Sequence, residues 1–85
     1  MASQEELKRR TEEREQAGKR AEDIAKELEK TKSEKDRRVL KQRLQDEVDS
    51  MKRHEKSIKD RWKDEYDKNK ERWESQRREL ERKCR

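Results

Sequence analysis

Five residues between positions 40 and 84 stand at equal steps of eleven. They are Leu40, Met51, Trp62, Trp73 and Cys84. Eleven residues make three turns of an α-helix at about 3.67 residues per turn, so side chains with this spacing share one angular position on a helix. Both tryptophans of the chain belong to the series. The spacing therefore predicts a long helix with one apolar stripe along its side.

The other apolar residues extend this stripe into a seam whose main step is seven residues, the spacing of a coiled-coil interface. The seam has an N-terminal part (4–30), a polar gap (31–38) and a part with the aromatic residues (39–84). Arg10 and Arg14 interrupt the first part, and after Trp62 the register shifts by four residues, so seven- and eleven-residue repeats mix. The predicted helix–helix interface comprises Leu7, Ala17, Ala21, Ile24, Leu28, Leu40, Leu44, Val48, Met51, Ile58, Trp62, Tyr66, Trp73 and Leu80.

This seam contains nearly all the apolar side chains that could form a core, because only 22% of the 85 residues are apolar and 60% are charged. At about 25 cal/mol per Å² of buried apolar surface, so few large side chains do not offset backbone ordering at roughly 1–2 kcal/mol per residue. The chain has no proline and one glycine, and it is rich in Glu, Lys, Arg and Gln, which favour helix over disorder. We therefore expect an all-α protein: one long, nearly continuous helix over residues 4–84 that completes its core as a coiled coil.

A helical hairpin that turns near residues 31–36 is the alternative architecture. Within that stretch both "TKSE" and "SEKD" match the capping box with which a second helix can begin. In a hairpin the numbers of facing residues add to a constant, and apolar pairs such as Leu28 with Leu40 give 68 or 69. Two observations favour the continuous rod. The gap contains no Gly, Pro or Asn, and a longer second helix would leave the aromatic residues beyond Trp62 uncovered.

The sequence contains no pattern typical of an active site. Its one histidine, His54, lies among charged residues, and its one cysteine, Cys84, has no internal disulfide partner. We predict no catalytic, cofactor-binding or metal-binding residues, and we expect that the protein is not an enzyme. No apolar run reaches the ~20 residues of a membrane span, and no signal peptide opens the chain. A reducing, cytoplasmic setting is expected.

The seam resembles stalk segments of cytoskeletal, tethering and scaffold proteins, and this resemblance implies a non-catalytic segment for oligomerisation. The expected partner is a second copy in a homodimer, or another helix. The net charge of +5 supports an alternative, a basic helical module that binds a polyanion such as a microtubule surface or a nucleic acid. Because cations alternate with anions, sequence-specific reading of nucleic acid is not expected. An isolated charged helix is the third interpretation.

Overall fold

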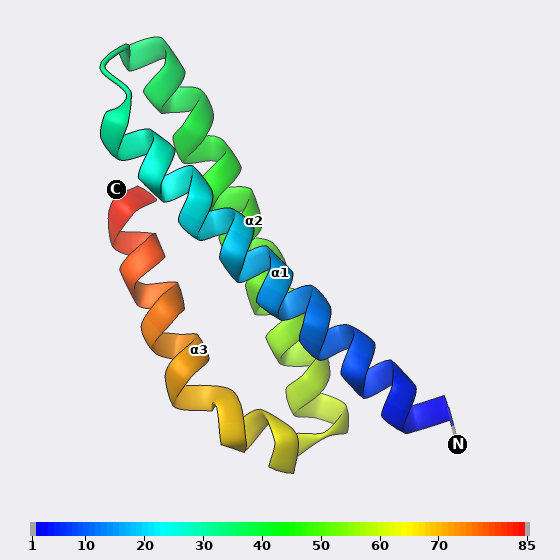
Figure 1. Cartoon of the computed structure of the whole chain (residues 1–85). Helices are drawn as coiled ribbons and strands as arrows, with labels where there is room; N and C mark the ends of the chain where they lie inside the picture. Colours follow the sequence, from blue (N-terminus) through cyan, green and yellow to red (C-terminus); the bar gives the residue numbers. More distant parts are fainter. Residues whose placement is uncertain (1, 85) are drawn as a thin grey trace.

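The computed structural model describes residues 2–84, which form three α-helices and no strands. Helix α1 spans Ala2–Lys30, α2 spans Glu34–Arg61 and α3 spans Lys63–Cys84. Helices α1 and α2 lie antiparallel, and α3 folds back along α2, so that its C-terminal end lies beside the last turns of α1 (Figure 1). The molecule measures 50 × 21 × 15 Å. The all-α prediction is confirmed, and the helices pack as a three-helix bundle.

The prediction of one nearly continuous helix is wrong, because the chain leaves the helical conformation twice. The first break comes at residues 31–33, where the alternative hairpin placed its turn. The second break is a single residue, Trp62, and neither predicted architecture included it. The hairpin prediction left the last twenty residues as an uncovered overhang, whereas the second break returns them to the bundle.

Side chains cap the first turn, which lacks the Gly, Pro or Asn that commonly ends a helix. The Arg37 guanidinium donates to the Leu28 carbonyl (3.2 Å) and to the Thr31 carbonyl (3.4 Å), which satisfies groups that α1 leaves unpaired at its end. The Ser33 hydroxyl accepts a hydrogen bond from the Asp36 backbone N–H at 3.5 Å and caps the start of α2. The chain therefore turns without a residue of special conformational freedom.

The second turn is a sharp corner without a loop. Helix α2 ends at Arg61 and α3 begins at Lys63, with Trp62 between them at φ −135° and ψ 65°. The Trp62 N–H still donates to the Ile58 carbonyl (2.6 Å), and its own carbonyl accepts from the Tyr66 N–H (2.9 Å). The backbone thus keeps a hydrogen-bonded path through the corner.

Burial of the aromatic residues explains why the chain folds up instead of forming a rod. Trp73 is completely buried and Tyr66 is 7% exposed. An aromatic side chain removes ~150–250 Å² from water, which stabilises the fold by about 4–6 kcal/mol each. Breaking a helix forfeits a few hydrogen bonds worth ~1 kcal/mol apiece. Folding within one chain also avoids the entropic cost of bringing two chains together.

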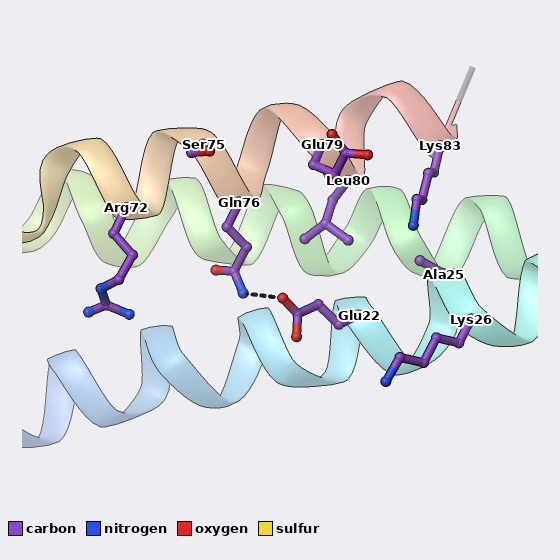
Figure 2. A pocket seen from close by; sticks show the side chains of 9 residues that line it. All are labelled: Glu22, Ala25, Lys26, Arg72, Ser75, Gln76, Glu79, Leu80 and Lys83. Carbon is purple, nitrogen blue, oxygen red and sulfur yellow. Dashed lines mark hydrogen bonds between the residues drawn. The ribbon is translucent and has the colours of Figure 1, made fainter.

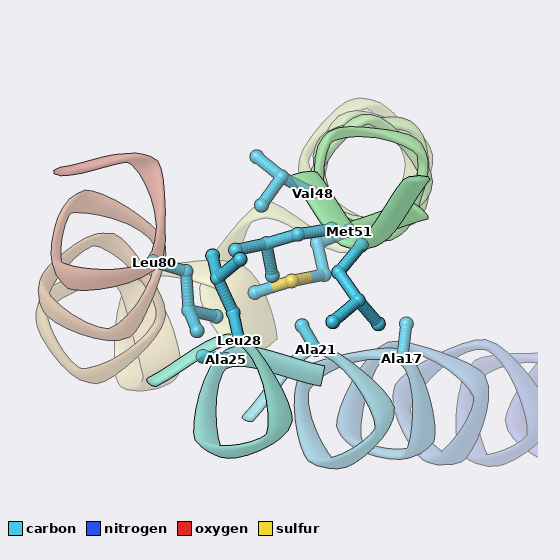
Figure 3. Packing of buried hydrophobic residues seen from close by; sticks show 9 residues of the cluster. Ala17, Ala21, Ala25, Leu28, Val48, Met51 and Leu80 are labelled. Atoms are coloured by element: carbon cyan, nitrogen blue, oxygen red, sulfur yellow. The ribbon is translucent and has the colours of Figure 1, made fainter. Parts of the chain in front are cut away.

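The buried apolar residues form two clusters. The larger one joins all three helices (Figure 3), and three nearly fully buried alanines on α1 allow the helices to approach closely. In the smaller one the Tyr66 and Trp73 ring centroids lie 6.2 Å apart. The larger cluster comprises Ala17, Ala21, Ala25, Leu28, Leu40, Leu44, Val48, Met51 and Leu80, with Ile24 and Cys84 packed against it; the smaller comprises Ile58, Tyr66 and Trp73, with Leu7 and Trp62.

Candidate functional site

All fourteen residues of the predicted helix–helix interface lie in or against these two clusters. Eleven are buried, and Leu7, Ile24 and Trp62 are partly buried. The prediction omitted Ala25, which is 1% exposed. The contacts join helices of one chain, so the seam is occupied by the chain's own helices. Pairing with a second chain stays a prediction.

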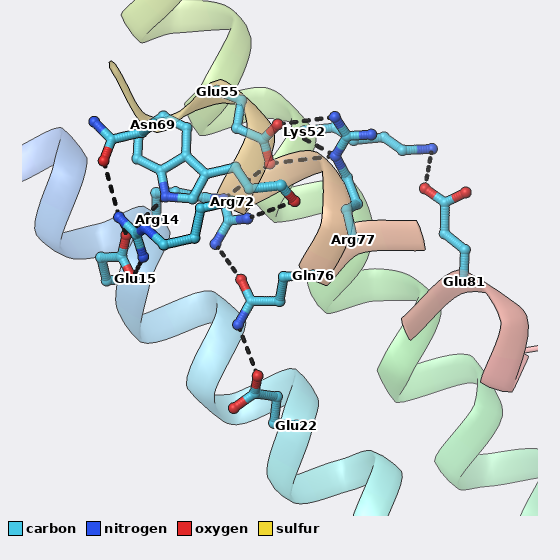
Figure 4. A network of polar contacts seen from close by, with 11 residues as sticks. Arg14, Glu15, Glu22, Lys52, Glu55, Asn69, Arg72, Gln76, Arg77 and Glu81 are labelled. Carbon is cyan, nitrogen blue, oxygen red and sulfur yellow. Dashed lines mark hydrogen bonds and ion pairs between the residues drawn. The ribbon is translucent and has the colours of Figure 1, made fainter. Parts of the chain in front are cut away.

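A buried ion-pair layer lies between the two clusters. Its centre is the Glu55 carboxylate of α2, which is 3% exposed and receives one guanidinium from each of the other helices. Arg14 of α1 donates from Nε to Oε2 at 2.8 Å, and Arg77 of α3 donates from Nη2 to Oε1 at 3.0 Å (Figure 4). This one carboxylate therefore connects all three helices.

All three guanidinium nitrogens of Arg14 donate hydrogen bonds to other groups of the protein. It donates from Nη1 to the Gln76 side chain (2.9 Å) and from Nη2 to the Trp73 carbonyl (3.3 Å), and it lies 5.2 Å from the Trp73 ring centroid. Burial lowers the pKa of Arg14, and the neighbouring Glu55 opposes that shift. Arginine stays a cation in proteins, so this position holds a permanent buried charge. The residue that interrupts the apolar seam thus becomes the link between the helices.

Gly18 provides the space that this layer needs. A Cβ at this position would lie 2.7 Å from Oε1 of Gln76 and 2.9 Å from Nη1 of Arg14. The backbone of Gly18 does not have a positive φ. Glycine therefore serves here by leaving room for the Gln76 and Arg14 side chains, and its backbone conformation is an ordinary one.

A second carboxylate holds α1 to α3 at the edge of the layer. Glu15 accepts hydrogen bonds from the Trp73 indole (2.7 Å) and from Arg72 (2.8 Å). Burial alone would raise the pKa of Glu15, but the hydrogen bonds from Arg72 and Trp73 outweigh it and lower the pKa below its ordinary value. The layer thus aligns the helices and holds its charged groups in pairs.

A groove of about 760 Å³ separates α1 from α3. A hydrogen bond from Gln76 to Glu22 (2.9 Å) crosses between the two helices there (Figure 2). Ala25 and Leu80 are its apolar residues, and its charged residues carry both signs. This mixture does not select a ligand of either charge. The lining residues are Glu22, Ala25, Lys26, Arg72, Ser75, Gln76, Glu79, Leu80 and Lys83.

The positive charge of the protein is concentrated at the end formed by the α1–α2 turn. Residues 30–43 contain seven Lys and Arg but two Asp and Glu, so their excess of five equals the net charge of the whole chain. Among the described residues, none of the seven cations pairs with a carboxylate. We call this surface the basic end; its cations are Lys30, Lys32, Lys35, Arg37, Arg38, Lys41 and Arg43.

The basic end also carries an exposed apolar side chain. Val39 is 50% exposed, and Lys35 and Arg43 lie four residues to either side of it, on the same face of α2. Five of the seven cations are exposed, and Arg37 and Lys41 are half-buried. The surface therefore suits a negatively charged partner with some apolar character.

Sequence reasoning did not identify the basic end, because neighbouring anions nearly balance it over a longer segment: residues 31–60 carry ten cations and seven anions. A window of fourteen residues reveals the segment 30–43. The signal is present in the sequence, but it extends over only about half the length of a helix.

Comparison of the chain with known protein families, with characterised proteins and with solved structures finds no match. Over residues 2–84 no helix combines the length and hydropathy needed to cross a membrane. The same part of the chain holds no group of His, Cys, Asp and Glu side chains arranged to bind a metal. The candidate site of this small, highly charged bundle is therefore the basic end.

Proposed function

We propose that this chain is a non-catalytic binding module whose basic end docks an acidic segment of another protein. The observation that carries the proposal is the set of seven cations without carboxylate partners in residues 30–43. Elsewhere many cations are already paired, for example Arg20 with Glu47 (2.7 Å) and Lys52 with Glu81 (3.1 Å). Unpaired charges contribute more to an incoming partner, since no existing ion pair has to be broken.

An acidic protein segment suits this surface better than a nucleic acid. Proteins that bind single-stranded nucleic acid stack bases on exposed aromatic rings, but Tyr66 and Trp73 are buried in the core, and the partly exposed Trp62 lies at the other end of α2 from the basic end. Val39 offers an apolar contact that a side chain of a protein partner can use and a phosphate backbone cannot. Acidic tails such as those on microtubules have the required chemistry.

Binding of a fluorescent oligoglutamate peptide, followed by anisotropy, tests this proposal. The double variant Lys35→Glu/Arg38→Glu should bind at least tenfold more weakly, because each exposed ionic contact contributes up to about 1 kcal/mol and reversal makes it repulsive. Lys63→Glu/Lys70→Glu is the matched control, since it makes the same charge change on α3 and both lysines are exposed. Binding should also weaken as salt rises from ~0.05 to ~0.5 M.

Two results would contradict the proposal. Equal loss of binding in both double variants would mean that net charge alone, and not the basic end, attracts the peptide. Tighter binding of a DNA duplex than of the peptide at the same salt concentration would make nucleic acid the better partner. Co-sedimentation with microtubules, before and after proteolytic removal of their acidic tails, extends the test to a natural acidic surface.

Self-association through the seam is the second candidate function. It is favoured by the eleven-residue series that continues through Trp62, because this spacing suits a longer helix than either α2 or α3. A homodimer of this kind would serve as a scaffold or tether. A reducing, cytoplasmic setting is proposed for both candidates, because the one cysteine, Cys84, has no internal disulfide partner.

A further inference from the structure

The corner between α2 and α3 has no sequence signal for a turn. Residues 59–66 read "KDRWKDEY", with no glycine or proline. Trp62 is the one non-helical residue, and its φ of −135° is open to any amino acid. The α1–α2 turn, by contrast, has three non-helical residues and the Ser33 cap. The local sequence at Trp62 is therefore compatible with a continuous helix.

Few contacts hold the corner itself. Arg61 forms an ion pair with Glu6 of α1, the Lys59 ammonium lies 5.8 Å from the Tyr66 ring centroid, and Trp62 packs against the smaller apolar cluster. The ion pair is exposed on its Arg61 side, so its contribution is small. What mainly keeps α3 in place is its packing along α2 and α1.

That packing does not require α3 to belong to the same chain. Arg77 pairs with Glu55 and Glu81 pairs with Lys52 (3.1 Å), which places α3 antiparallel to α2. If residues 59–66 became helical in two copies, the α3 of each copy could lie on α1 and α2 of the other. The contacts that α3 makes with the buried ion-pair layer, such as Arg77 with Glu55 and Gln76 with Arg14, would then be remade between chains, while the Arg14–Glu55 pair would stay within each chain. Only the contacts at the corner would change.

We propose that this chain forms a helix-exchanged dimer, in which α2 and α3 join into one helix over residues 34–84 and α3 packs on the second copy. A helix of this length extends about 76 Å at 1.5 Å per residue, compared with 50 Å for the compact molecule. Because the exchanged contacts are the same, the balance between the two forms depends on the corner and on protein concentration. The partner is therefore a second copy of this chain.

Exchange would place one basic end at each of the two ends of the elongated dimer, since the two long helices run antiparallel. Such a dimer would bridge two acidic partners, a consequence that rests on the proposed function. The exchange itself does not rest on it. The experiments below measure assembly without any acidic ligand, so either idea can fail without the other.

A proline at position 63 is compatible with the compact form but not with the exchanged form. In the compact fold Lys63 is the first residue of α3, where proline is tolerated. Inside a continuous helix the same proline would clash with the carbonyl of Lys59 and disrupt the helix. Lys63→Pro should therefore lower the association constant of the dimer by roughly 100-fold or more. The matched control Lys63→Ala should dimerise at least as well as the native chain.

The measurement is light scattering after size-exclusion chromatography of samples refolded over a wide concentration range. Circular dichroism checks that Lys63→Pro keeps its helix content. We expect a concentration-dependent dimer for the native chain and for Lys63→Ala. A native chain that stays monomeric at every concentration would overturn the proposal, as would a Lys63→Pro variant that dimerises like the native chain.

Cross-linking distinguishes exchange from side-by-side association. Two variants, Lys52→Cys and Glu81→Cys, are made in a Cys84→Ser background, so that each chain carries one thiol. The mixture is refolded at high concentration and treated with a short bismaleimide. Exchange brings position 52 of one chain to position 81 of the other, so a cross-linked heterodimer should appear on a denaturing gel and disappear when Lys63→Pro is added. A dimer that does not give this cross-link would refute exchange.

Discussion

Neutralising Glu55 is the most direct test of the buried ion-pair layer. Glu55→Gln keeps the size and shape of the side chain and removes its charge. Arg14, which is 0% exposed and lies 2.8 Å from the carboxylate, would then have no buried counter-ion. Arg77 would lose its contact at 3.0 Å as well, but it is 19% exposed and can turn toward water. The main penalty therefore comes from the stranded Arg14 cation.

Removing one partner of a buried ion pair costs about 3–5 kcal/mol. At ~0.05–0.15 kcal/mol per residue, a chain of this length has a total stability of about 4–13 kcal/mol. Glu55→Gln should thus remove a large part of the stability and can unfold the protein outright. The exposed Arg20–Glu47 pair provides the matched control. Although its distance is as short (2.7 Å), Glu47→Gln should cost about 0–1 kcal/mol, because water solvates Arg20.

Urea denaturation followed by circular dichroism measures both free energies of unfolding. If Glu55→Gln and Glu47→Gln destabilise the protein by amounts within about 0.5 kcal/mol of each other, the layer does not hold the helices together as described. A third variant, Arg14→Met/Glu55→Met, removes both buried charges and restores apolar volume. It should be more stable than Glu55→Gln, because no buried cation is left without a partner.

Three further outcomes are expected. Gly18→Ala should change the free energy of unfolding by less than about 1 kcal/mol in urea titrations, because alanine favours helix by about 1 kcal/mol and its Cβ would meet only the ends of the flexible Gln76 and Arg14 side chains, which can shift. Burial lowers the pKa of His54, and hydrogen bonds to the anion lower that of Glu15 despite its burial, so both groups bind protons less readily when folded. Thermal melts should therefore show stability falling below about pH 6.5 and again below about pH 4.3, with the first step absent in His54→Gln. Trp73→Ala should cost about 3–5 kcal/mol and Trp62→Ala clearly less, since the first ring is fully buried and the second partly.

Local sequence patterns specify the helical conformation and nearly all apolar residues of the core. Helix-forming residues without proline specify helix through local backbone preferences, and steps of seven and eleven place apolar side chains on one face whatever that face packs against. For this reason all fourteen seam residues lie in or against the core. The capping pattern at Ser33 was equally local, and it marks the start of α2.

Contacts between residues far apart in the sequence specify which helix faces meet and where the chain turns a second time. Arg14 and Glu55 are 41 residues apart, and nothing near either residue in the sequence identifies the other as its partner. The corner at Trp62 follows from the same non-local cause. Local preferences there allow a helix to continue, but folding back buries Trp73 within one molecule, and that burial outweighs the few backbone hydrogen bonds that the corner sacrifices.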